Sequence, residues 1–166
     1  MVQLVPIEGG YLIMAERVPA DSHGQEIWFG VFDLEANLVS SRVVAAHGFD
    51  LYGQELVAAP AFVPVKGKVE PKARYILAAS KVKQADAGGA EFAALYMLDK
   101  DLKVLSSRAL VSGMNNRLLG LSRADDGGYL GTGYSYTEDG RKAGWLVRLD
   151  DEGGLLWQRV YPRGVG

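Results

Sequence analysis

One short pattern occurs three times in this chain and constrains its fold more than any other feature. It begins with an aspartate, continues through a turn-forming stretch and an apolar pair, and ends with an arginine nine residues after the aspartate. The three copies span residues 33–42, 99–108 and 150–159. A pattern that recurs without gaps indicates a protein built from repeated structural units.

Two segments with the residue types of β-strands precede each copy. The segment directly before the aspartate is rich in aromatic and β-branched residues, at 26–32, 91–98 and 143–149. The other segment starts at a tyrosine, which lies 22, 24 and 21 residues before the aspartate in the three units. Polar, glycine-containing stretches at 21–25, 86–89 and 137–142 separate the two segments and predict hairpin turns.

A further apolar segment precedes each tyrosine, at 2–7, 56–65 and 118–121, and completes four strands per unit. Residues 66–74 of the middle unit predict an exposed loop, whereas residues 51–59 suit either a short helix or irregular structure. A repeated four-stranded antiparallel meander is typical of β-propeller blades. We therefore predict an all-β protein of three such repeats in a propeller-like arrangement. It would be one domain, residues 1–166, with repeats at about 1–50, 51–115 and 116–166.

The third unit also resembles a known family. It combines residues 126–133, which read DGGYLGTG, with Trp145 five residues before Asp150 and with Gly154 and Trp157 after it. These residues resemble the repeats of bacterial β-propellers, whose blades carry DGGY, a glycine, W-x-x-x-x-D, a glycine and a tryptophan in that order. The first two units depart from this pattern, because Ser40 and Ser106 hold the position of Trp157. The resemblance implies a fold but no activity, since such propellers include lectins, enzymes and scaffolds alike.

Three repeats are too few for an ordinary closed propeller, which has four to eight blades. Two arrangements answer this shortage. In one, the three sheets form an open arc and a protein partner covers the exposed apolar surface. In the other, two chains associate and close a ring of six blades.

Composition excludes several classes of partner. The formal net charge is −2 and the 18 Lys and Arg residues are scattered, so we expect no nucleic-acid binding. No apolar run approaches the ~20 residues that cross a bilayer, so we expect no membrane insertion. The absence of cysteine excludes disulfides and thiolate chemistry. The start of the chain lacks the features of a signal peptide, but a leader removed earlier would leave the same sequence, so a periplasmic and a cytoplasmic location in a bacterium both stay open.

The sequence offers little for catalysis. His23 and His47 fall in different loops without a serine or carboxylate at motif spacing. The repeated aspartates suit turns, where a carboxylate accepts backbone N–H bonds, and no Asp-x-Asp-x-Asp-Gly loop for calcium is present. We predict no enzymatic activity, no metal site and no cofactor.

The aromatic residues divide into a predicted core and a predicted surface. Trp28, Phe32, Tyr96 and Trp145 lie inside strand segments and are expected in the core. Tyr134, Tyr136 and Trp157 lie among glycines and hydroxyl residues, where exposed rings would stack on a sugar or anchor a protein. A second candidate binding segment contains Ser112, Met114, Asn115 and Asn116.

These observations favour a non-enzymatic protein-binding module, and a small inhibitor or immunity-type protein that blocks another protein through its loops would suit its size. The alternatives are a lectin-like propeller that binds carbohydrate and one half of a six-bladed homodimer. The expected partner is accordingly another protein, a second copy or a carbohydrate.

Overall fold

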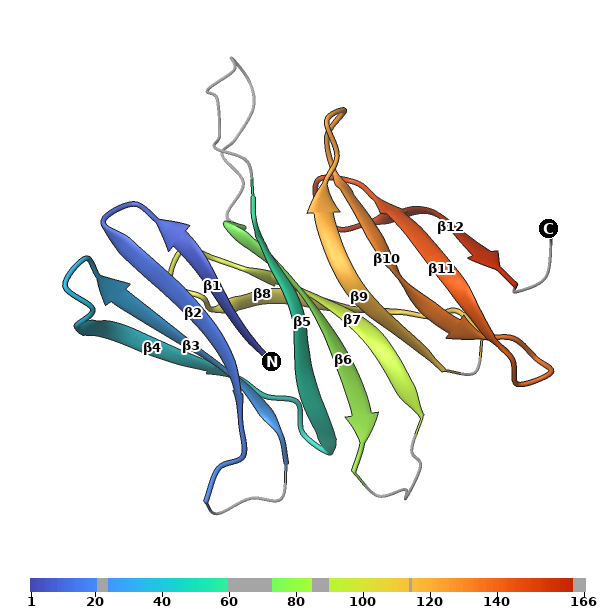
Figure 1. The fold of residues 1–166 in the computed structure, drawn as a ribbon, viewed down its shortest axis with the longest axis horizontal. Coiled ribbons are helices and arrows are strands. Elements are labelled where there is room, and N and C mark those ends of the chain that lie inside the picture. The colour runs from blue at the N-terminus through green and yellow to red at the C-terminus, as the bar shows by residue number, and fades with distance from the viewer. Residues whose placement is uncertain (21–23, 60–72, 85–89, 114, 163–166) are drawn as a thin grey trace.

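The computed structural model describes residues 1–20, 24–59, 73–84, 90–113 and 115–162. Within these ranges the chain forms twelve strands and no helix, arranged as three four-stranded antiparallel sheets (Figure 1). Each sheet is a meander of consecutive strands, so the sheet boundaries coincide with the sequence repeats. The predicted fold class of three four-stranded antiparallel meanders is confirmed.

The three sheets are called A, B and C. Sheet A contains β1 (Val2–Ile7), β2 (Gly10–Arg17), β3 (Glu26–Asp33) and β4 (Leu38–Val44). Sheet B contains β5 (Phe49–Ala58), β6 (Tyr75–Lys83), β7 (Glu91–Leu98) and β8 (Val104–Leu110). Sheet C contains β9 (Asn116–Arg123), β10 (Tyr129–Tyr136), β11 (Lys142–Leu149) and β12 (Leu155–Tyr161). Strand β5 replaces the helix or irregular segment considered for 51–59, and the predicted loop at 66–74 lies almost wholly outside the described residues.

The repeated aspartate builds the same turn in every sheet. Oδ1 of Asp33, Asp99 and Asp150 accepts the backbone N–H groups two and four residues further on, at 2.5–3.0 Å. The residue three positions after the aspartate has a positive φ, at 64° in Ala36, 60° in Leu102 and 76° in Gly153. A register shift just before each aspartate completes a bulged hairpin. The turn role predicted for the aspartates is confirmed.

Sheet B lies between the other two sheets and has both faces buried. The A–B core includes Leu12, Phe29 and Leu77, and the B–C core includes Ile76 and Trp145. Successive residues Ile76 and Leu77 thus enter different cores, as the period of two in a β-strand requires. Alternating apolar and polar residues are not needed in β6 and β7, because neither face of these strands meets water.

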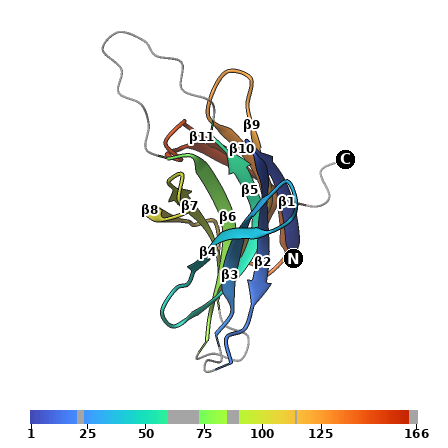
Figure 2. The same ribbon diagram turned by 90° about the vertical axis from the view of Figure 1, so that its left-hand side faces the viewer.

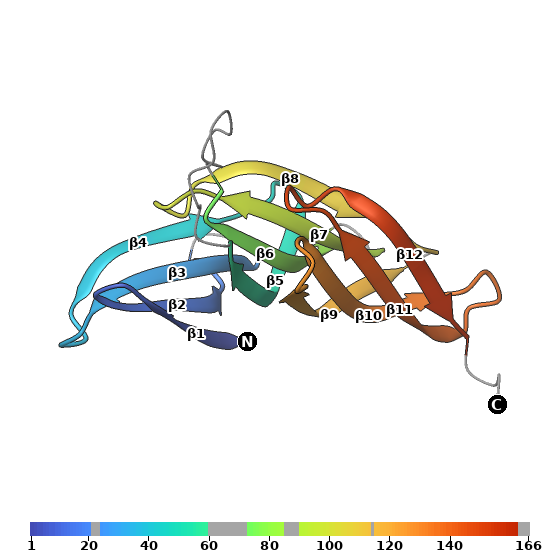
Figure 3. The same cartoon turned by 90° about the horizontal axis from the view of Figure 1, so that it is seen from above.

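Sheets A and C form the two ends of an open arc. Strand packing connects sheet A to sheet B and sheet B to sheet C, whereas no comparable packing joins A to C in the described part of the chain. Figure 3 shows the fan from above, with β4, β8 and β12 along one side. Figure 2 views the molecule from the side of sheet A. Each terminal sheet therefore packs on sheet B with one face and has no neighbouring sheet on the other.

Two of the four aromatic residues expected in the core are not there. Tyr96 and Trp145 are buried, as predicted. Trp28 and Phe32 are only half-buried, because the strand register puts them on the face of sheet A that points away from sheet B. The prediction for these two residues was wrong because a strand sequence does not say whether a second sheet covers the face.

Candidate binding surfaces on the terminal sheets

The centre of the uncovered face of sheet A is apolar, and the next row along β2 and β3 contains the ion pair of Arg17 and Glu26. The register aligns Val2 with Ala15 and Trp28, and Leu4 with Ile13 and Gly30. A third row contains Pro6, Tyr11 and Phe32. We call these nine residues the A face. Among its members Val2 is 74% exposed, Leu4 56% and Tyr11 36%.

Two aromatic rings flatten the middle of the A face. Trp28 and Phe32 meet edge to face with ring centroids 6.4 Å apart. Both rings lie over Gly30, where a Cβ atom would collide with the indole and would come within 2.8 Å of the Phe32 ring. Glycine at this position therefore lets the rings lie against the sheet, and they form a continuous apolar surface.

The positions of the repeat that are uncovered in sheet A are buried in sheets B and C. The strand-opening tyrosine is Tyr11 on the A face, while its counterparts Tyr75 and Tyr129 pack in the A–B and B–C cores. Five residues before the repeated aspartate, Trp28 corresponds to the buried Trp145. The A face therefore has the residues of a sheet-to-sheet interface but no second sheet.

The uncovered face of sheet C is more polar and less even. Three rows of residues cross it from β9 to β12. The first row contains Arg117, Tyr134, Gly144 and Tyr161, and the second contains Gly120, Thr132, Leu146 and Arg159. The third row contains Ser122, Leu130, Arg148 and Trp157. We call these twelve residues the C face. Lys142 Nζ lies 3.6 Å from the ring centroid of Tyr134, and Arg159 lies 5.5 Å from that of Trp157. The C face thus combines aromatic rings, cations and small residues.

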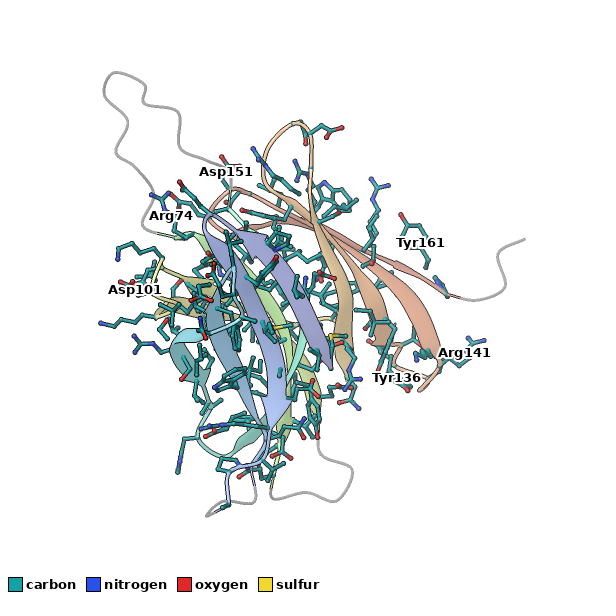
Figure 4. All side chains as sticks on the ribbon, turned by 60° about the vertical axis from the view of Figure 1, so that its left-hand side comes forward. Arg74, Asp101, Tyr136, Arg141, Asp151 and Tyr161 are labelled. Carbon is teal, nitrogen blue, oxygen red and sulfur yellow. The ribbon has the colours of Figure 1, made fainter. Side chains whose placement is uncertain are left out.

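The strand register separates Trp157 from the other two residues of the predicted aromatic site, Tyr134 and Tyr136. Tyr134 and Tyr136 contact each other edge to face, with centroids 5.9 Å apart. Trp157 lies opposite Arg148, four residues along β11 from Gly144, which lies opposite Tyr134. At about 3.3 Å per residue this separates Trp157 from Tyr134 by about 13 Å. Tyr161, rather than Trp157, shares the row of Tyr134, and Figure 4 shows it extending from β12.

The ring of Tyr134 already has partners. Its hydroxyl donates to Glu91 Oε2 at 3.3 Å, and Glu91 also pairs with Arg117. Burial and the Glu91 carboxylate raise the pKa of the Tyr134 phenol above 10.0. With Lys142 on its face, Tyr134 has one side of the ring occupied.

The second predicted binding segment fastens sheet C to sheet B. Oδ1 of Asn116 accepts the backbone N–H of Ala93 at 2.8 Å, and Oδ1 of Asn115 accepts that of Glu91 at 2.9 Å. The Ser112 carbonyl accepts the side chains of Asn116 and Ser135. Ser112 and Asn116 are buried, and Met114 lies outside the described residues.

The remaining sequence candidates are dispersed. His47 is exposed in the turn before β5, and His23 lies outside the described residues. The described residues contain no group of three side chains that could hold a metal ion, and no helix long and apolar enough to cross a membrane. A cavity of about 50 Å³ lies between sheets B and C and is lined by Met97, Arg108, Glu152 and Gly153 among others. It is smaller than the 300–1,000 Å³ typical of ligand pockets.

Comparison with known proteins adds no family to this description. No protein-family model matches the chain, and no curated protein matches its sequence. The two uncovered faces are therefore the features of the molecule that bear on its function.

Proposed function

We propose that the protein is a non-enzymatic protein-binding module whose A face receives a sheet of its partner. One observation carries this proposal: the A face presents apolar side chains at the positions that sheets B and C bury against a neighbouring sheet. Burying such side chains contributes about 1.5–3 kcal/mol each. Contiguous apolar surface of this kind usually marks an interaction site.

The chemistry of the A face favours a protein over a sugar. Its nine residues contain no charged group, and the tyrosine hydroxyl of Tyr11 is their sole side-chain hydrogen-bonding group apart from the indole N–H of Trp28. Carbohydrates need several hydrogen-bonding groups beside a stacking ring, whereas the centre of a protein interface is rich in aromatic and aliphatic side chains. An inhibitor or immunity-type role, in which loops block the bound protein, stays a hypothesis within this proposal.

Photo-cross-linking tests the proposal. A photoreactive amino acid at Leu4 should form an adduct with a protein in the cell, while the same probe at Lys103 in the exposed turn of sheet B should not. The purified partner should bind with a fixed stoichiometry, and Trp28→Ala should weaken that binding by at least about tenfold, because a central tryptophan contributes about 2 kcal/mol or more. The proposal is wrong if the probe at Leu4 forms no adduct with another protein or with a second copy of the chain. It is also wrong if Trp28→Ala leaves the affinity unchanged.

A further inference from the structure

We infer that the sheet received by the A face is the C face of a second copy of this chain, so that two chains close a ring of six sheets. This inference rests on the proposed function and names its partner. The three sheets follow one another in the same orientation along the arc, and sheets B and C each pack the face that carries their strand-opening tyrosine on the preceding sheet. The C face is therefore the surface on which a fourth sheet would pack, and the A face is the surface that a preceding sheet would cover.

The two internal interfaces show how such sheets fit together. Each core cluster contains a bulky residue from one sheet and a small residue from the other sheet at these positions of the repeat. In the B–C core Trp145 of sheet C shares its cluster with Ala93 of sheet B, and in the A–B core Ala94 of sheet B shares its cluster with Ile27 of sheet A. Trp145 and Ala94 stand five residues before the repeated aspartate, and Ala93 and Ile27 stand six residues before it.

The same positions are complementary between the A face and the C face. Five residues before the aspartate, sheet A has Trp28, and six residues before it, sheet C has Gly144. A Cβ at Gly144 would have no neighbour closer than 3.8 Å, in Tyr161, so there is room beside this backbone. The indole of Trp28 would fill this room, and the interface would then combine a large and a small residue, as the B–C cluster combines Trp145 and Ala93. Close packing of this kind is what protein interiors require.

The B–C interface also contains a polar contact between equivalent positions of the repeat. In the B–C interface Arg108 Nη1 donates to the carbonyl oxygen of Gly153 at 3.1 Å, and Glu152 lies beside it. Arg108 is the repeated arginine, and Gly153 is the third residue after the next aspartate. The corresponding pair between two chains is Arg159 of one copy and Ala36 of the other.

Charge supports this second contact. Residue Glu35 corresponds to Glu152 and is exposed, while Arg159 makes no ion pair with the described residues and lies over Trp157. The other two arginines of the C face pair with carboxylates of their own chain, Arg117 with Glu91 and Arg148 with Asp126, so Arg159 is the cation that can meet Glu35. Opposite charges across an interface favour the correct pairing and steer the encounter.

The number of sheets per chain also indicates that the ring contains two copies. A head-to-tail interface forms a closed ring if the rotation between units closes and an open filament if it does not. Closed propellers contain about four to eight blades. Two copies supply six sheets, whereas one supplies three and three supply nine, so two is the number of copies that falls in this range.

Solution mass and one substitution on each face test the inference. Light scattering should give twice the 17.9 kDa of the chain. Trp28→Glu should weaken self-association at least about thirtyfold, because it places a charge at the centre of the apolar contact. Leu105→Glu introduces the same charge at an exposed apolar side chain on β8 of sheet B and should leave the mass unchanged. Circular dichroism checks that each variant retains its sheets.

Mixing variants tests the head-to-tail geometry. Gly144→Arg fills the space on the C face and should also give a monomer. Trp28→Glu retains an intact C face and Gly144→Arg retains an intact A face, so an equal mixture should regain a two-chain species through one native interface. A Gly144→Arg protein that is still dimeric would overturn the inference.

The remaining outcomes separate the inference from the proposed function. A wild-type protein that stays at 17.9 kDa as its concentration rises overturns the two-chain ring. If that monomer binds a different protein and Trp28→Ala weakens the binding, the proposed function holds and only the identity of the partner is wrong. If no protein covers Leu4 in the cross-linking experiment, both are wrong.

Discussion

The residue three positions after each repeated aspartate adopts a left-handed backbone conformation with a different side chain in each sheet. Glycine occupies it in sheet C, but Ala36 has a φ of 64° and Leu102 a φ of 60°. A side chain in this conformation costs roughly 1–2 kcal/mol, which only glycine avoids. The surroundings differ as well, since Ala36 is exposed and Leu102 is buried in the A–B core.

The same substitution should therefore have opposite effects at these two positions. Ala36→Gly should raise the free energy of unfolding by up to about 1 kcal/mol, because strain is relieved and no packing is lost. Leu102→Gly should lower it by about 2 kcal/mol or more, because the loss of a buried leucine exceeds the relief of strain. Urea denaturation of both variants in the Trp28→Glu background measures the two effects without self-association. Destabilisation by both substitutions would contradict the role assigned to the left-handed conformation.

Two buried hydroxyl groups have no hydrogen-bond partner among the described residues, Ser80 Oγ and Tyr129 Oη. A buried polar group without a partner costs about 1–3 kcal/mol. Burial also raises the pKa of the Tyr129 phenol above 10.0, because the phenolate would be poorly solvated.

Removing either hydroxyl should not weaken the fold. Ser80→Ala and Tyr129→Phe are each expected to leave the free energy of unfolding unchanged or to raise it by up to about 1 kcal/mol, since both retain the packing of the side chain. Thermal unfolding provides the measurement, and Tyr96→Ala, which removes a buried ring, provides a destabilised reference. A loss of 1 kcal/mol or more would mean that the hydroxyl has a partner, such as an ordered water molecule.

At the scale of the element, the turn between β10 and β11 is held by hydrogen bonds to the carboxylate of Asp139. The carboxylate of Asp139 accepts hydrogen bonds from Thr137 Oγ1 and from the guanidinium of Arg141. These two contacts lower the pKa of Asp139 from 3.8 to about 2. A lowered pKa means that the folded state favours the charged carboxylate, so this contribution is present above pH 3.8 and is lost as the pH falls through about 2.

An NMR titration of the side-chain carboxyl group tests this local arrangement. The midpoint for Asp139 should lie near 2, and Thr137→Ala and Arg141→Ala should each raise it, because each substitution removes a hydrogen bond to the carboxylate. Both variants should leave sheets A and B unchanged, since the turn is exposed and lies at the end of sheet C. A midpoint near 3.8 in the wild-type protein would show that the turn does not hold this geometry in solution.

The elements that were predicted from the sequence are those rich in aromatic and β-branched residues beside a repeated turn. The tyrosine strand begins 21–24 residues before the repeated aspartate in every unit, so it and the strand that ends at the aspartate could be predicted in all three units. Strand β5 was less evident because the register shifts between Gly53 and Glu55. This bulge lets Leu51 and Leu56 enter the same core although they are five residues apart. Strict alternation would place them on opposite faces.

At the scale of the whole molecule, the candidate surface was not predicted because burial depends on which sheets are neighbours. Trp28 and Trp145 hold the same position in their units, yet Trp145 is 2% exposed and Trp28 is half-buried at the end of the arc. The sequence predicted a shortage of sheets and an uncovered apolar surface. The A face itself became apparent only when the sheets were placed in order along the arc.

The arc also predicts an uneven distribution of stability. Sheets stacked in one dimension are stabilised by their own contacts and by those with their neighbours. Sheet B has two neighbours and the terminal sheets have one each, so the backbone amides of β6 and β7 should exchange with deuterium more slowly than those of β2, β3, β10 and β11 at low protein concentration.

Raising the concentration should change only part of this pattern if two chains close a ring. Sheets A and C would each gain a neighbour, so the amides of β2, β3, β10 and β11 should become more protected while those of β6 and β7 change little. The Trp28→Glu variant should not show this gain at any concentration, which provides the control. Equal protection of all three sheets in the dilute protein would show that it unfolds as one cooperative unit. Protection that rises in sheet A alone would indicate that the A face packs on the same face of the second chain.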